Sequence, residues 1–184
     1  MHRVITLLLL ILTINGCAQK SFSPTETVKS YYAAFDDSNF PRIKSLISDS
    51  LTIIEGDYTT GYSYDSFYEQ YKWDSIFQTT YDLVELKEIG SSVLVTVSST
   101  SPRYAFLKNN PLISQYKVSF KKEKISKIEL VDYVDADFAV WEREREALVA
   151  WVKLNHPELD GFIHDLSMQG AMNYLKAIEL YRRR

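Results

Sequence analysis

The sequence predicts an α+β protein, and two observations carry this prediction. Apolar residues recur every three to four positions over residues 24–75 and again over 134–184, which is the spacing of helices with one buried face. Over residues 79–131, apolar and polar residues alternate instead, which is the period of half-buried strands. Helices before and after a run of strands favour a helix-covered antiparallel sheet.

The first residues indicate export. Met1-His2-Arg3 is basic and is followed by an apolar run from Val4 to Ile14. This run is too short to cross a bilayer, which takes roughly twenty residues, and it fits the core of a signal peptide. The ending Gly16-Cys17 resembles a bacterial lipobox, which implies cleavage after residue 16 and acyl chains such as palmitate on Cys17. An ordinary secretory signal with a chance cysteine is the alternative.

The amino-acid composition excludes some classes of cross-link and binding partner. Cys17 is the only cysteine, so no disulfide can form within the chain. The net charge of −3 argues against nucleic acid, which requires a concentrated basic face. We expect a domain lipid-anchored to the bacterial membrane. Because Ala18 rather than Asp follows the cysteine, the expected site in a cell with two membranes is the outer membrane, facing the periplasm.

The N-terminal half is predicted to be mainly helical. After a tether over 17–23, a helix begins with Ser23 as N-cap, Pro24 in the first turn and Glu26 completing a capping box. A short second helix carries Ile43, Leu46 and Ile47. The segments after it are predicted as a strand over 51–54, a loop over 56–61, and a third helix capped by Ser63.

The central part is predicted to be a sheet, and the last fifty residues return to helix. The expected strands cover 79–89, 92–99, 112–120 and 125–131, with a connection over 102–111 and a charged turn over 121–124. In the C-terminal helices, two apolar stripes are expected to pack on the domain: Phe138, Trp141, Leu148, Trp151 and Val152 in one, and Met168, Ala171, Met172, Leu175 and Ile178 in the other.

The order of elements resembles the nuclear transport factor 2-like cone fold. Val28-Lys29-Ser30-Tyr31-Tyr32-Ala33-Ala34-Phe35 and the segment 39–47 are similar to the opening helix pair, and Asp49 to Gly56 is similar to the strand that follows. The resemblance covers 24–133, with 134–184 as a helical extension. It implies a curved antiparallel sheet wrapped around the N-terminal helices, with a pocket at the open end. The family includes ketosteroid isomerases, polyketide cyclases and dehydratases.

The resemblance also implies candidate catalytic residues. Tyr31 falls where the isomerases carry a tyrosine that donates to the enolate oxygen, and Tyr116 falls near their second donor. The base would be Glu55 or Asp57, although the isomerases' Asp-Pro pair is absent here. The expected pocket wall is aromatic and consists of Tyr31, Tyr32, Phe35, Phe67, Tyr71 and Tyr116.

Neither a metal nor a cofactor is expected. His156 and His164 are eight residues apart, about 12 Å along a helix, too far to share an ion. No glycine-rich phosphate loop or nucleophile elbow is present.

Three functions remain open. The leading hypothesis is a lipid-anchored envelope protein whose cone domain binds a small hydrophobic or amphipathic ligand, or has an accessory role, without catalysis. The first alternative is an isomerase-, cyclase- or dehydratase-type enzyme for a small hydrophobic substrate. The second is a structural partner in a membrane complex, in which the pocket is filled by side chains. The expected protein partner is either a second copy of the chain or another envelope protein.

Overall fold

The computed structural model describes residues 22–184; the expected signal peptide and Cys17 lie outside the described residues. The helices are α1 Pro24–Asp36, α2 Phe40–Leu46, α3 Tyr64–Ser75, α4 Pro102–Phe106, α5 Phe138–Asn155 and α6 Met168–Arg182, with the 3-10 turns η1 Pro157–Leu159 and η2 Phe162–His164. The strands are β1 Ile47–Glu55, β2 Tyr58–Tyr62, β3 Thr80–Ile89, β4 Ser92–Thr100, β5 Leu112–Lys121 and β6 Lys124–Val134. Within 22–184, no helix is both long and apolar enough to cross a bilayer.

Side-chain caps set the helix starts as the sequence predicts. Ser23 Oγ accepts a hydrogen bond from the Glu26 backbone N–H at 3.3 Å. At the start of α3, Ser63 Oγ accepts from the Ser66 backbone N–H, and Ser66 Oγ accepts from the Ser63 backbone N–H at 2.9 Å. Each cap satisfies N–H groups that have no partner inside the helix.

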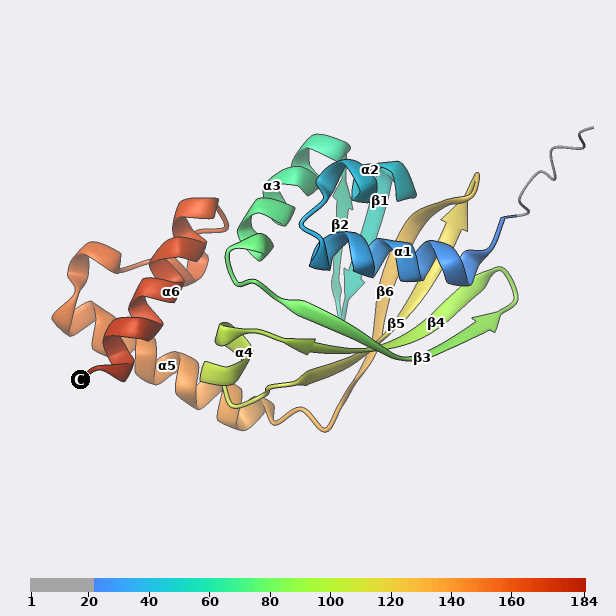
Figure 1. The fold of residues 1–184 in the computed structure, drawn as a ribbon. Coiled ribbons are helices and arrows are strands. Elements are labelled where there is room, and N and C mark those ends of the chain that lie inside the picture. Colours follow the sequence, from blue (N-terminus) through green and yellow to red (C-terminus); the bar gives the residue numbers. More distant parts are fainter. Residues whose placement is uncertain (1–21) are drawn as a thin grey trace, which may run out of the picture.

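The six strands form one sheet in the order β2-β1-β6-β5-β4-β3, and Figure 1 shows α1 crossing it. The α+β class and the curved sheet are confirmed, with one correction: β1 and β6 are parallel, whereas every other neighbouring pair is antiparallel. No hairpin links these two strands, so nothing local imposes the antiparallel direction. Register shifts interrupt the ladder between Leu83 and Glu85 and between Gln115 and Tyr116, and such bulges bend strands.

The segment predicted as a loop over 56–61 contains strand β2, so that prediction was wrong. Gly56 and Asp57 form a two-residue turn, with Gly56 at φ +58°, and Glu55 then pairs with Tyr58. A two-residue Gly-Asp connection between apolar segments is a hairpin signal. This hairpin adds β2 to the sheet as an edge strand.

Two hydrophobic cores are present. The first lies between α1–α3 and the concave face of the sheet; its fully buried members include Val28, Ala34, Ile43, Ile47, Val93, Val95 and Ile125. The second lies where α5 and α6 meet α3 and α4, at the end of the sheet opposite the entry of the chain into α1 (Figure 1). Its members include Trp73, Phe77, Phe106, Leu107, Leu148, Val152, Tyr174 and Ile178.

The buried face of α6 differs from the predicted stripe. Met168 and Met172 are 43% and 39% exposed, whereas Tyr174 and Ala177 are buried. Ala171 and Ile178 of the predicted stripe are buried, and Gly170 lets the preceding loop approach the helix closely. A Cβ on Gly170 would lie 2.0 Å from the Asp165 carbonyl oxygen, so only glycine fits there.

Two leucines of α5 provide a matched test of the second core. Leu148 is fully buried and Leu154 is 83% exposed. We expect Leu148→Ala to lower the free energy of unfolding by about 2–5 kcal/mol, and Leu154→Ala to change it by less than about 0.5 kcal/mol. Urea denaturation of both variants measures this. Equal effects would contradict a core formed between α5 and its neighbours.

Candidate ligand-binding site

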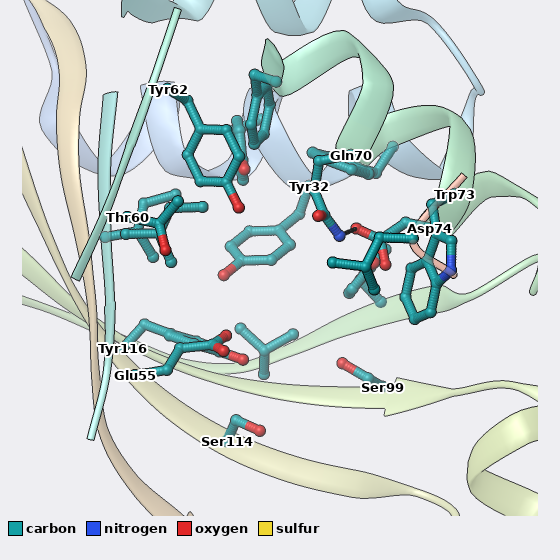
Figure 2. Close-up of a pocket in the computed structure, with 18 of the residues that line it drawn as sticks. Tyr32, Glu55, Thr60, Tyr62, Gln70, Trp73, Asp74, Ser99, Ser114 and Tyr116 are labelled. Carbon is teal, nitrogen blue, oxygen red and sulfur yellow. Dashed lines mark hydrogen bonds between the residues drawn. The ribbon is translucent and has the colours of Figure 1, made fainter. Parts of the chain in front are cut away.

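The cone contains a cavity of about 400 Å³. Its walls come from α1, α3 and all six strands of the sheet, together with Arg103 and Tyr104 of α4. Leu166, from the loop before α6, also lines it, so the C-terminal extension reaches the cavity. Figure 2 shows the labelled side chains converging on one space, with Thr60 and Tyr62 on one side, and Gln70 and Asp74 on the other.

The structure places most of the sequence-predicted residues around this cavity. Five of the six expected wall residues line it: Tyr31, Tyr32, Phe35, Phe67 and Tyr116. Tyr71 instead lines a neighbouring cavity of about 160 Å³, which shares Phe35, Asp74 and Tyr81 with the first. Glu55 lines the main cavity from an exposed position at the end of β1, whereas Asp57 lies in the exposed hairpin turn and is not part of the wall.

The tyrosine hydroxyls form a polar lining inside aromatic walls. Burial raises the pKa of Tyr31 and of Tyr32 above the usual value for a phenol, so both stay protonated and can donate hydrogen bonds. Within residues 22–184, the hydroxyls of Tyr31, Tyr32 and Tyr62 have no hydrogen-bond partner. Figure 2 shows the Tyr32 and Tyr62 hydroxyls directed into the cavity. They are therefore available to a bound molecule.

Asp74 is the half-buried carboxylic acid that lines the cavity, and the sequence pattern did not predict it. It lies on α3 and accepts a hydrogen bond from Gln70 Nε2 at 3.3 Å (Figure 2). Burial raises its pKa to about 6, although the positive charge of Arg103 and the bond from Gln70 act in the opposite direction. A carboxyl with this pKa can hold or release a proton near neutral pH.

Arg103 supplies the positive charge and was also missed. Ser101 caps α4 by accepting from the Tyr104 backbone N–H at 3.1 Å, which places Arg103 in the first turn. Its guanidinium carbon lies 4.9 Å from the ring centroids of Trp73 and Phe77, a cation–π arrangement. Within the described residues, its buried Nε has no hydrogen-bond partner, and Arg103 forms no ion pair with Asp74 within 4.0 Å.

The sequence signals for these two residues were weak. Asp74 follows Trp73 near the end of a helix rich in polar residues, where an acid usually faces water. Arg103 lies in a segment between prolines that was predicted as a connection. Elsewhere, His156 Nδ1 lies 3.2 Å from Glu158 Oε1, and no three metal-ligating side chains of residues 22–184 gather at one point.

Comparisons with known proteins identify the fold. No family model matches the sequence, and no curated protein is detectably similar to it. Among solved structures, an NTF2-like protein of unknown function from Cytophaga hutchinsonii aligns with TM-score 0.51 at 11% identity, over 63% of this chain and 94% of the other. The fold is nuclear transport factor 2-like. IdmH from Streptomyces antibioticus, a proposed polyketide cyclase, aligns with TM-score 0.51 at 12% identity, over 67% of this chain and 99% of IdmH.

The raised pKa of Asp74 makes stability depend on pH. In the unfolded chain an aspartate titrates near pH 4, so the folded state holds the proton more tightly between about pH 4 and 6. Below about pH 4 the folded chain bears no cost for a charge on Asp74, because the carboxyl is protonated. Above about pH 6 it bears the full cost. The quantity to compare is the free energy of unfolding of Asp74→Asn minus that of the unsubstituted chain. We expect this difference to be roughly 2–3 kcal/mol larger at pH 8 than at pH 4.

The measurement is urea denaturation of Asp74→Asn at a series of pH values. Asp57→Asn removes the same charge from the exposed hairpin turn and is the control. A stability difference between Asp74→Asn and the unsubstituted chain that stays constant from pH 4 to pH 8 would contradict the buried, proton-retaining carboxyl.

Proposed function

We propose that this protein binds a small amphipathic molecule in the cone cavity. The observation that carries the proposal is the lining itself: aromatic walls, with tyrosine hydroxyls that have no hydrogen-bond partner within residues 22–184. A volume of about 400 Å³ is in the range of small-molecule sites, roughly 300–1,000 Å³. Aromatic surface would bind the apolar part of a ligand, and the hydroxyls would orient its polar part.

We further propose that the domain acts at a membrane surface, through a lipid on Cys17. In the proposed layout, residues 1–16 are a signal peptide, 17–23 a tether, 24–133 the cone domain and 134–184 its helical extension. A tether of this length spans at most about 25 Å when fully extended. The cavity would therefore stay within a short distance of the bilayer. Stable attachment would need more than one acyl chain.

An enzyme of the isomerase, cyclase or dehydratase type is the second candidate, because Asp74 provides a proton-transferring group inside the cavity. A general base works best with a pKa near the working pH, and that of Asp74 is raised to about 6. Asp74 would then replace Glu55 or Asp57 in that role, with Tyr31 as donor. Turnover of a carbonyl substrate that Asp74→Asn abolishes would favour the enzyme. The structural-partner alternative needs a filled cavity, and the open cavity counts against it.

Two neighbouring threonines of β2 test binding. Thr60 lines the cavity and Thr59 does not, because successive strand residues face opposite sides. Thr60→Trp should narrow the cavity and weaken binding of the uncharged dye N-phenyl-1-naphthylamine at least about tenfold, whereas Thr59→Trp should leave it unchanged. Fluorescence titration gives both affinities. Equal affinities, or no saturable binding to the unsubstituted protein, would refute the proposed site.

The anchor has its own test. Cys17→Ser removes the only thiol that could carry the lipid. We expect this variant to remain unprocessed or to leave the membrane fraction, whereas Ser21→Ala, in the same tether, should behave as the unsubstituted protein. The measurement is cell fractionation combined with the mass of the mature N-terminus. Unlipidated Cys17 in the membrane-bound mature protein would exclude this anchor.

A further inference from the structure

The charged groups of the cavity have opposite signs and do not neutralise one another directly. Glu55, Asp74 and Arg103 are the charged side chains among the described residues that line it. Asp74 and Arg103 lie at the same end, on α3 and α4, close enough for the arginine to influence the pKa of the acid. They are nevertheless more than 4.0 Å apart, too far for an ion pair.

Each of these two groups has unused hydrogen-bonding capacity. The Asp74 carboxylate has about four acceptor sites and receives one bond, at 3.3 Å, from Gln70. Of the five guanidinium N–H groups of Arg103, the structure pairs one, in a 3.5 Å contact with the Tyr104 hydroxyl. Trp73 and Phe77 hold its guanidinium through their rings, which use none of the N–H groups. The cavity thus presents an acceptor and a donor side by side.

A ligand with a single charge does not match this end of the cavity. An anion bound to Arg103 would lie beside Asp74, with Glu55 adding to the repulsion. A cation bound to Asp74 would lie beside Arg103. A molecule that carries both charges on neighbouring atoms can satisfy both partners, since each charge then meets its opposite.

We infer that the cavity binds a small zwitterion of the aromatic α-amino-acid type, with its ammonium group on Asp74 and its carboxylate on Arg103. The inference rests on the proposed binding function and specifies its ligand class. The guanidinium can pair with a carboxylate in a bidentate manner, and its aromatic stack fixes its plane. The apolar part of the ligand lies against rings such as Tyr32 and Phe35.

Three probes that share a phenyl ring separate the charge contributions. L-phenylalanine carries both charges, 2-phenylethylamine only the positive one, and 3-phenylpropionate only the negative one. Calorimetric titration of the full mature chain at about pH 7.5 should give phenylalanine an affinity at least about tenfold higher than either of the others. Asp74→Asn should remove this advantage, whereas the surface control Asp57→Asn should preserve it.

A second variant tests the arginine without removing its charge. Arg103→Lys retains the cation but loses the planar fork, so phenylalanine should bind at least about fivefold more weakly while the circular dichroism spectrum stays unchanged. If that variant does not fold, the Asp74→Asn comparison alone decides. Preferential binding of 3-phenylpropionate or of 2-phenylethylamine would overturn the zwitterion in favour of a singly charged ligand.

The outcomes also separate this inference from the proposed function. If none of the three probes binds while the dye still binds and Thr60→Trp still weakens it, the zwitterion is wrong and the binding site stands. If the dye does not bind either, both are wrong. If phenylalanine is the only one of the three probes that displaces the dye, and Asp74→Asn abolishes this displacement, both the zwitterion and the binding site are supported.

Discussion

Helix α3 packs into two hydrophobic cores at once, and the rest of the structure depends on this arrangement. Phe67 and Tyr71, one helical turn apart, enter the core under the cone. Trp73 and Phe77, again four residues apart, enter the core shared with α5 and α6. Phe67 and Tyr71 lie on one side of α3, whereas Trp73 lies on another side and Phe77 in the turn that follows the helix. The helix therefore sets the position of the cone relative to the C-terminal extension.

The charged end of the cavity lies at the junction of these cores. Asp74 directly follows Trp73, and Arg103 stacks on the rings of Trp73 and Phe77. Phe77 in turn packs against Tyr174 of α6, with ring centroids 5.7 Å apart. Helix α6 thus supports the guanidinium indirectly, because Tyr174 packs on Phe77 and Phe77 stacks on Arg103. A binding group supported in this way is held in place before a ligand arrives, which lowers the cost of binding.

The sequence predicted what is local and missed what depends on distant contacts. Caps such as Ser23 and Ser63 identify helix starts because the cap and its partner lie three residues apart. Strand alternation identified β3 to β6, and the resemblance placed Tyr31 and Tyr116 near one pocket. Asp74 and Arg103 could not be paired from sequence, because their proximity arises only when α4 packs against α3.

Burial of Asp74 has an energetic cost that its protein neighbours do not remove. Its raised pKa means that desolvation outweighs both the attraction of Arg103 and the bond from Gln70. Packing alone would favour an apolar residue at this place in the wall. A side chain that breaks the local rules of stability without a compensating structural partner is expected at functional sites. The fold provides only the cavity, as it does for proteins of many different activities. Asp74 and Arg103 are the side chains through which this cavity would select the proposed zwitterion.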